Sequence, residues 1–196
     1  MIKTIFALSS GQPPAGIAVI RISGPNAGSA LLTLAGTLPT ERRARFVRLH
    51  DASGDPLDDA LVLWLPGPRT ATGEDIAELH LHGGRAVVRS VEQALAGMPA
   101  LRKAEPGEFT RRAFANGRID LAEAEGLADL LSAETDLQRR AALAMAEGGL
   151  SRQVDIWREQ VLMLAARVEA VLDFGDEDDV AGLPADFNEK LGNVSR

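Results

Sequence analysis

Residues 16–24 read Gly-Ile-Ala-Val-Ile-Arg-Ile-Ser-Gly, and this stretch sets the architecture of the first part of the chain. Its β-branched residues, closed by Ser23-Gly24, predict a buried strand over residues 16–23. Upstream, Thr-Ile-Phe-Ala-Leu at residues 4–8 predicts another strand, and the intervening Ser-Ser-Gly-Gln-Pro-Pro of residues 9–14 has the composition of a turn. The sequence therefore predicts two paired strands joined by a loop.

Around this pair, the first hundred or so residues keep the apolar and period-two runs of a sheet. Pro25 suits the first turn of a helix through Leu34, and Gly36 suits the position just past its end. The same reasoning predicts strands over 45–49, 57–65 and 75–82 and a helix over 84–96. The result is a β-rich α/β pattern.

Beyond about residue 117 the periodicity becomes helical, which predicts a second unit. Pro106 is expected to start a short helix that Asn116-Gly117 stops, and Asp120 with Glu123 predicts a capping box for a helix continuing through Met145. A long helix is expected from Ser151, after the Gly148-Gly149 break. Its predicted core residues are Val154, Trp157, Val161, Leu164 and Val168.

Composition limits the class of protein. A formal charge of −7 opposes nucleic-acid binding by the chain as a whole, and the absence of cysteine excludes a thiol nucleophile and a disulfide framework. No apolar run approaches the roughly 20 residues of a membrane helix, and no export signal is evident. A cytoplasmic protein without a membrane span is the expectation. The sequence also holds no Gly-x-x-x-x-Gly-Lys-Ser/Thr, so these residues supply no P-loop.

Two ionisable residues fall in the predicted strands where apolar ones are usual. Alternation places Arg21 on one strand face with Ile17 and Val19, and it places Glu78 with His80 on a face of residues 75–82. Arg21 and Glu78 are thus candidates to share one pocket, where the carboxylate would accept two parallel hydrogen bonds from a ring such as a pterin. The alternative is that they pair with each other or face water.

The other candidate sites have simpler explanations. His80 and His82 share a face but lack an evident third ligand, so no metal is expected. Gly83-Gly84 before a helix is either an anion cradle or a purely geometric turn. The acidic group Asp173, Asp176, Glu177, Asp178 and Asp179 lacks the ligand pattern of a calcium loop and is expected to be a solvated helix end. The basic run Arg42, Arg43, Arg45 and Arg48 is either an RNA contact or, more simply, a solvated strand edge.

Several ordered motifs resemble the MnmE (TrmE) family of tRNA-modifying GTPases, over nearly the whole chain. They are Thr4-Ile5 with residues 16–24, Pro66-Gly67-Pro68, residues 72–78, His82-Gly83-Gly84, residues 106–110, Arg112-Ala113-Phe114, residues 116–121, Ala124-Glu125, Asp129-Leu130, and Asp173-Phe174 before Asp176-Glu177. The block over residues 106–121 is highly specific.

The resemblance implies an α+β protein in three parts. Residues 1–117 would form an α/β tetrahydrofolate-binding domain of the aminomethyltransferase type, which also makes a homodimer. Residues 118–175 would form the first half of an all-α helical domain, and 176–196 a linker toward a GTPase domain that these residues do not contain. In the family, 5-formyl- or 5,10-methylenetetrahydrofolate is bound at the positions of Arg21, Glu78 and Arg118. Arg118 stands where lysine is common, and the loop over residues 9–15 departs from the usual glycine-rich form.

The resemblance also implies a reaction shared with the FAD-containing MnmG (GidA) partner. That reaction adds an aminomethyl or carboxymethylaminomethyl group to carbon five of the tRNA wobble uridine, using the folate one-carbon unit. GTP, potassium and magnesium would act through the GTPase domain, so no catalytic residue is expected here and these residues alone should not hydrolyse GTP. Two rival hypotheses are a ligand-free dimerisation scaffold and a one-carbon transferase that acts alone.

Overall fold

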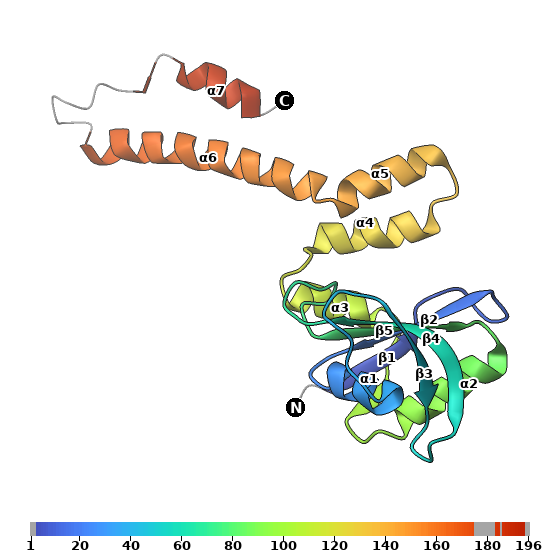
Figure 1. Ribbon diagram of the computed structural model, residues 1–196. Coiled ribbons are helices and arrows are strands. Elements are labelled where there is room, and N and C mark those ends of the chain that lie inside the picture. The colour runs from blue at the N-terminus through green and yellow to red at the C-terminus, as the bar shows by residue number, and fades with distance from the viewer. Residues whose placement is uncertain (1–2, 175–182, 185, 195–196) are drawn as a thin grey trace. The chain divides into compact units, whose positions relative to one another are not determined.

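The computed structural model describes residues 3–174, 183, 184 and 186–194. The chain folds into two compact units, residues 1–119 and 120–196. The first unit is a mixed sheet with helices and the second consists of helices, so the fold is α+β as expected (Figure 1).

The first unit is built on a six-stranded sheet of order β3-β4-β5-β2-β1-β6. The predicted opening pair is confirmed, with β1 antiparallel to β2 and Ala7 opposite Arg21. Only the β1–β6 pairing is parallel within the described residues. The strands are β1 (Thr4–Leu8), β2 (Ile17–Ser23), β3 (Arg45–His50), β4 (Pro56–Leu65), β5 (Ile76–His82) and β6 (Leu101–Lys103).

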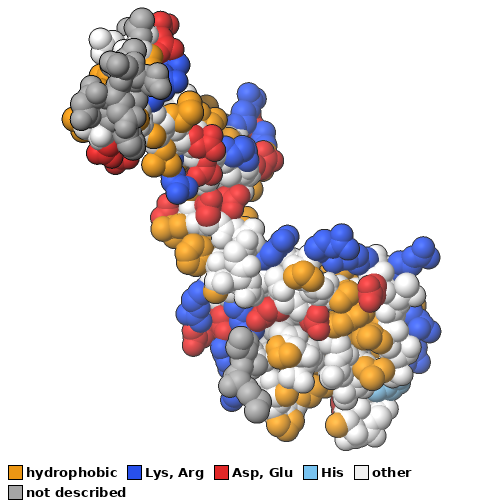
Figure 2. Space-filling model, turned by 90° about the vertical axis from the view of Figure 1, so that its left-hand side faces the viewer, with side chains coloured by type: hydrophobic (Ala, Val, Ile, Leu, Met, Phe, Trp, Pro, Cys, Tyr) orange, Lys and Arg blue, Asp and Glu red, His pale blue; other side chains and the backbone are white. Residues whose placement is uncertain are grey.

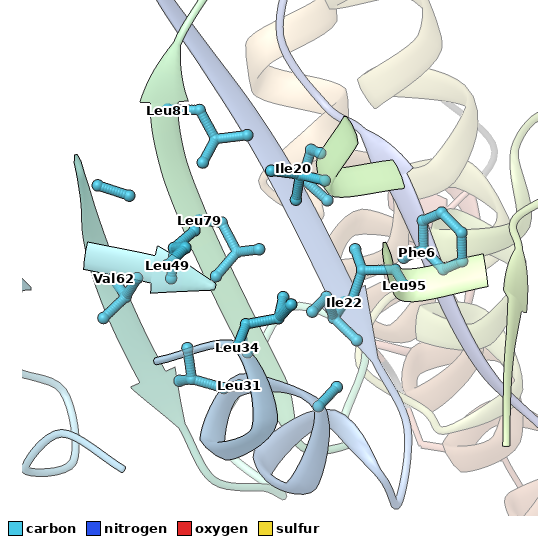
Figure 3. Close-up of a cluster of buried hydrophobic side chains, with 14 of the residues drawn as sticks. Phe6, Ile20, Ile22, Leu31, Leu34, Leu49, Val62, Leu79, Leu81 and Leu95 are labelled. Carbon is cyan, nitrogen blue, oxygen red and sulfur yellow. The ribbon is translucent and has the colours of Figure 1, made fainter. Parts of the chain in front are cut away.

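Two helices cover one face of this sheet and enclose the core. Leu31 and Leu34 of α1 (Ala27–Ala35) and Leu95 of α2 (Arg85–Ala96) are fully or nearly fully buried against the inward residues of the strands (Figure 3). Val91 of α2 is also fully buried in this core. Gly36 ends α1 in the left-handed conformation, as its position predicts. The inward strand residues include Ile20, Ile22, Val62, Leu79 and Leu81.

A third helix, α3 (Glu108–Ala115), lies on the side of the sheet away from α1 and α2 (Figure 1). It starts two residues after Pro106, with left-handed Gly107 at its N-terminal boundary, and it stops at Asn116 as predicted. The three residues of β6 were not predicted, because a strand this short has no periodicity to detect.

The second unit begins with a helical hairpin. Asp120 caps α4 (Leu121–Ser132) with the predicted box to Glu123. The predicted continuous helix through Met145 is wrong, because the chain turns after Ser132 and Thr135 opens α5 (Asp136–Ala146) with a second capping box to Gln138. Gly126 lets the two helices approach closely, since a Cβ there would lie 2.5 Å from the backbone nitrogen of Ala146.

The rest of the second unit is the long helix α6 (Gly149–Phe174) and the short α7 (Phe187–Val194). Leu164 is buried and Val168 is partly buried, but Val154, Trp157 and Val161 are about half exposed, so the prediction that these last three are core residues is wrong for this chain. In the view of Figure 2, hydrophobic side chains reach the surface among charged ones. Asp173 ends up in α6, while Asp176, Glu177, Asp178 and Asp179 lie outside the described residues.

Candidate functional site

The outer face of the sheet, opposite α1 and α2, carries the residues singled out in the two strands. Strand pairing places Arg21 of β2 opposite Glu78 of β5, and Glu78 in turn opposite Leu63 of β4. The next row on this face is Val19, His80, Leu61 and Phe46, one residue from each of β2, β5, β4 and β3. Arg21 and Glu78 therefore lie side by side at the centre of the sheet, next to a row that is apolar except for His80.

Arg21 and Glu78 form an ion pair. The Arg21 Nε and Nη2 atoms each lie 2.9 Å from Glu78 Oε1, and His80 Nε2 lies 3.3 Å from Glu78 Oε2. The side chain of Glu78 is 17% exposed and that of Arg21 33%. The predicted shared face is confirmed, and so is the alternative that the two residues pair with each other. A carboxylate has about four lone-pair positions, so Glu78 can accept further donors.

Arg118 lies apart from this pair, after the end of α3. Its Nε donates to the carbonyl oxygen of Thr70, 3.1 Å away, in the 66–75 loop that connects β4 to β5. Asn116 donates to the carbonyl oxygen of Thr72 in the same loop at 2.7 Å. The structure thus brings Arg21 and Glu78 into contact and attaches Arg118 to a loop that leads into the strand of Glu78.

A polar network that the sequence reasoning missed lies beneath α3. Glu74, at the end of the 66–75 loop, accepts from Arg112 Nη1 at 2.9 Å and from Ser23 Oγ at 2.8 Å. Arg112 Nη2 also donates to Glu108 Oε1 at 3.0 Å, and Arg102 donates to the other Glu108 oxygen at 2.7 Å. We call Glu74, Glu108, Arg112 and Asn116 the α3–loop network.

Glu108 is the most buried acid of this network, with 3% of its side chain exposed. The hydrogen bonds from Arg102 lower the pKa of Glu108 to about 2, against the opposing effect of burial and with help from the Glu105 backbone N–H and Arg112. One signal for this network was present in the sequence, because Glu108 and Arg112 are spaced i,i+4 on a helix. The contribution of Glu74, 34 residues before Glu108, has no local signal.

His82 and three arginines of the basic run have protein partners. His82 Nδ1 and its backbone N–H both bind Asp58 at 2.8 Å, and the bond to the Asp58 carboxylate raises the pKa of His82. In the basic run, Arg48 pairs with Asp59, Arg45 donates to Thr37, and Arg42 donates to the carbonyl oxygens of Pro66 and Arg69. These contacts favour a structural explanation for the three arginines.

Outside this face, the described residues hold neither a group of metal ligands nor a membrane-spanning helix. No group of three or more His, Cys, Asp or Glu side chains in the described part is placed to hold a metal ion. None of the helices within residues 3–174 and 186–194 is long and apolar enough to cross a membrane. A hollow of about 200 Å³ between α6 and α7 is lined by Met163, Leu164 and Val194 among others, and no predicted site residue lies in it.

Comparison with known proteins identifies the family. Residues 4–118 match the family described as the GTP-binding protein TrmE N-terminus, and residues 121–195 match the MnmE helical domain. Similar proteins named tRNA modification GTPase MnmE occur in Novosphingobium aromaticivorans (73% identity, 92% of this chain and 41% of the relative) and in Erythrobacter litoralis (66% identity, 98% and 46%). A third, from Rhizorhabdus wittichii, is 61% identical over 96% of this chain and 43% of its own length.

The chain therefore spans less than half the length of these relatives. Both matched regions follow the division into a sheet unit and a helical unit. The matches and the motifs over residues 106–121 agree, and the chain belongs to the MnmE (TrmE) family of tRNA modification GTPases.

Proposed function

We propose that this chain is the reduced-folate-binding and dimerising part of a tRNA modification GTPase. It binds 5-formyl- or 5,10-methylenetetrahydrofolate on the outer face of the sheet, with Glu78, Arg21 and Arg118 as contacts. The observation that carries the proposal is the half-buried Arg21–Glu78 pair at the centre of a sheet face, in a chain of the MnmE family.

The chemistry of these side chains fits a folate. A pterin ring presents adjacent N–H donors, and the remaining lone pairs of Glu78 are suited to accept them. The two guanidinium groups match the carbonyl and carboxylate oxygens of the same ligand. The bound folate supplies a one-carbon unit, while the residues of this chain hold and orient it.

The whole protein then acts with an MnmG (GidA) partner on carbon five of the tRNA wobble uridine, in the cytoplasm. Because residues 1–196 contain no P-loop sequence, binding of GTP with potassium and magnesium is assigned to other parts of the protein.

A homodimer through the first unit is part of the proposal. Ile17, Phe46 and Leu61 are 64%, 69% and 39% exposed on the outer face. Phe46 and Leu61 are cross-strand partners and form a contiguous apolar surface, whereas Ile17 lies opposite His82, outside their row. Association that covers this row would remove apolar area from water.

The alternative function is a ligand-free scaffold, and one observation favours it. Arg21 and Glu78 already satisfy each other, so the structure does not require a ligand at this position. A one-carbon transferase acting without MnmG and GTP is a further alternative, with no specific support in the geometry.

Calorimetric titration with 5-formyltetrahydrofolate separates these functions. The wild-type chain is expected to bind, and Glu78→Ala to lose at least about tenfold in affinity, the size of one lost charge-assisted hydrogen bond. Asp59→Ala is the matched control, because Asp59 is also an Arg-paired strand carboxylate but pairs with exposed Arg48. No binding by a folded wild-type chain would favour the scaffold.

A further inference from the structure

The 66–75 loop is attached to α3 and the residues after it at three points. The Glu74 carboxylate binds Arg112, the Thr72 carbonyl oxygen accepts from Asn116, and the Thr70 carbonyl oxygen accepts from Arg118. These contacts join segments about 40 residues or more apart in sequence. The loop is therefore held by tertiary contacts.

Steric contact accompanies these hydrogen bonds. Gly73 has a φ of +77°, and a Cβ there would lie 3.0 Å from Asn116 Cβ and 3.2 Å from Arg118 Cγ. Thr72 is 1% exposed. The backbone of the loop thus packs directly against the stem of the Arg118 side chain, with no room for a side chain between them.

Arg112 connects this contact to the sheet. Its Nη1 binds Glu74, while its Nη2 binds Glu108 and the carbonyl oxygen of Lys3 at 2.8 Å, next to β1. Glu74 in turn accepts from Ser23 Oγ, and Ser23 lies two residues from Arg21 on the same face of β2. Two residues along a strand span about 7 Å. A chain of direct contacts therefore runs from the loop that binds Arg118 to the strand that carries Arg21.

We propose that the Glu74–Arg112 pair is a positioning device that sets the place of Arg118 relative to the Arg21–Glu78 pair, and so fixes the spacing of the folate contacts. This role rests on the proposed folate function. A ligand that must contact both places binds more tightly when their separation is already fixed, because less conformational freedom is lost on binding. Glu74 and Arg112 act through Arg118 and need not touch the folate.

The test is a double-mutant cycle on 5-formyltetrahydrofolate affinity, measured on the full chain. Glu74→Gln keeps a hydrogen-bond acceptor for Ser23 but loses the charge that binds Arg112. We expect it to weaken binding on the order of tenfold in the wild-type background and less than about twofold in an Arg118→Gln background, because coupled residues are not additive. Hydrogen exchange of residues 67–74 should rise in Glu74→Gln.

Two further variants serve as a matched control and as a conservative substitution. Arg111→Gln is the matched control, because Arg111 neighbours Arg112 on α3 but pairs with exposed Glu105, and it should leave affinity and loop exchange unchanged. Arg112→Lys keeps the charge but loses the fork that spans Glu74 and Glu108, and it should show a partial loss with the same dependence on Arg118.

The outcomes distinguish this role from the function on which it rests. If the wild-type chain binds folate and Glu74→Gln binds equally well, the positioning role fails while the folate site stands. Equal losses in both backgrounds would also overturn it, since a general loss of stability does not depend on Arg118. If the folded wild-type chain binds no folate, the proposed function fails and the positioning role fails with it.

Discussion

At the scale of single residues, two groups of charged side chains differ in burial, and we propose a ligand site for the first and a structural role for the second. Arg21 and Glu78 are partly exposed and lie on strands, where the backbone fixes their separation. Glu108 is almost fully buried between Arg102 and Arg112, which suits a structural role. The difference in burial is the reason that we propose the first pair, and not the second group, as ligand contacts.

The low pKa of Glu108 makes the stability of the first unit depend on pH. Its pKa falls from 4.5 to about 2 on folding, so its contribution is present above about pH 4.5 and is lost as the pH falls toward 2. Glu108→Gln is expected to lower the free energy of unfolding by about 3 kcal/mol at pH 7, with the difference from wild type shrinking below pH 4.5.

Urea unfolding followed by Trp64 fluorescence measures this effect, in a Trp157→Phe background so that only the tryptophan in the first unit reports. Glu105→Gln is the control, because Glu105 is 65% exposed and its change should stay within about 0.5 kcal/mol. A difference between Glu108→Gln and wild type that stays constant from pH 7 to pH 2.5 would contradict the assignment.

At the scale of elements, the strands and the first two helices were predictable because alternation, turn residues and helix caps all agree. The break between α4 and α5 was missed because the alanine-rich sequence favours helix throughout. The signal was nonetheless present, since Thr135 and Gln138 have the spacing of a capping box. Helix propensity alone does not predict where the chain turns and starts a second, packed helix.

Gly126 in α4 allows the two helices of the hairpin to pack closely. A Cβ at this position would lie 2.5 Å from the Ala146 nitrogen and 2.8 Å from the Met145 carbonyl carbon, and backbone atoms cannot move aside cheaply. Gly126→Ala should therefore destabilise the α4–α5 hairpin by about 1 to 3 kcal/mol, although alanine is the better helix former.

Hydrogen exchange over residues 121–146 measures the loss. Gly192→Ala in α7 is the control, because an added Cβ there has open space. Unchanged or increased protection of the hairpin in Gly126→Ala would show that the two helices do not pack at this distance.

At the scale of the whole molecule, the buried residues were easier to predict from the sequence in the sheet unit than in the second unit. The apolar positions of α6 follow a helical period, yet Trp157 and Val161 are exposed. The helical spacing of apolar residues indicates which face of a helix is suited to burial, but it does not indicate which other element covers that face. The Arg21–Glu78 face was likewise predictable from alternation, whereas the α3–loop network depends on contacts distant in sequence.

The proposed homodimer predicts that a charge in the exposed apolar row weakens association. Phe46→Asp places a charge in the row and should weaken the dimer at least tenfold, since desolvating an unpaired charge is costly. Sedimentation velocity over a range of concentrations measures the shift. Leu32→Asp on α1 is the control, because Leu32 is 48% exposed on a helix of the opposite face. Equal effects of the two variants would assign association to another surface.

The decisive measurement for the proposed folate site is a crystal structure of this chain with 5-formyltetrahydrofolate. We expect the pterin ring on the outer face of the sheet, with its N–H donors on the Glu78 carboxylate, Arg21 within reach of the ligand and the 66–75 loop still attached to Arg112. The proposed site would be contradicted by a folate bound elsewhere, with the Arg21–Glu78 ion pair intact and buried under other protein atoms.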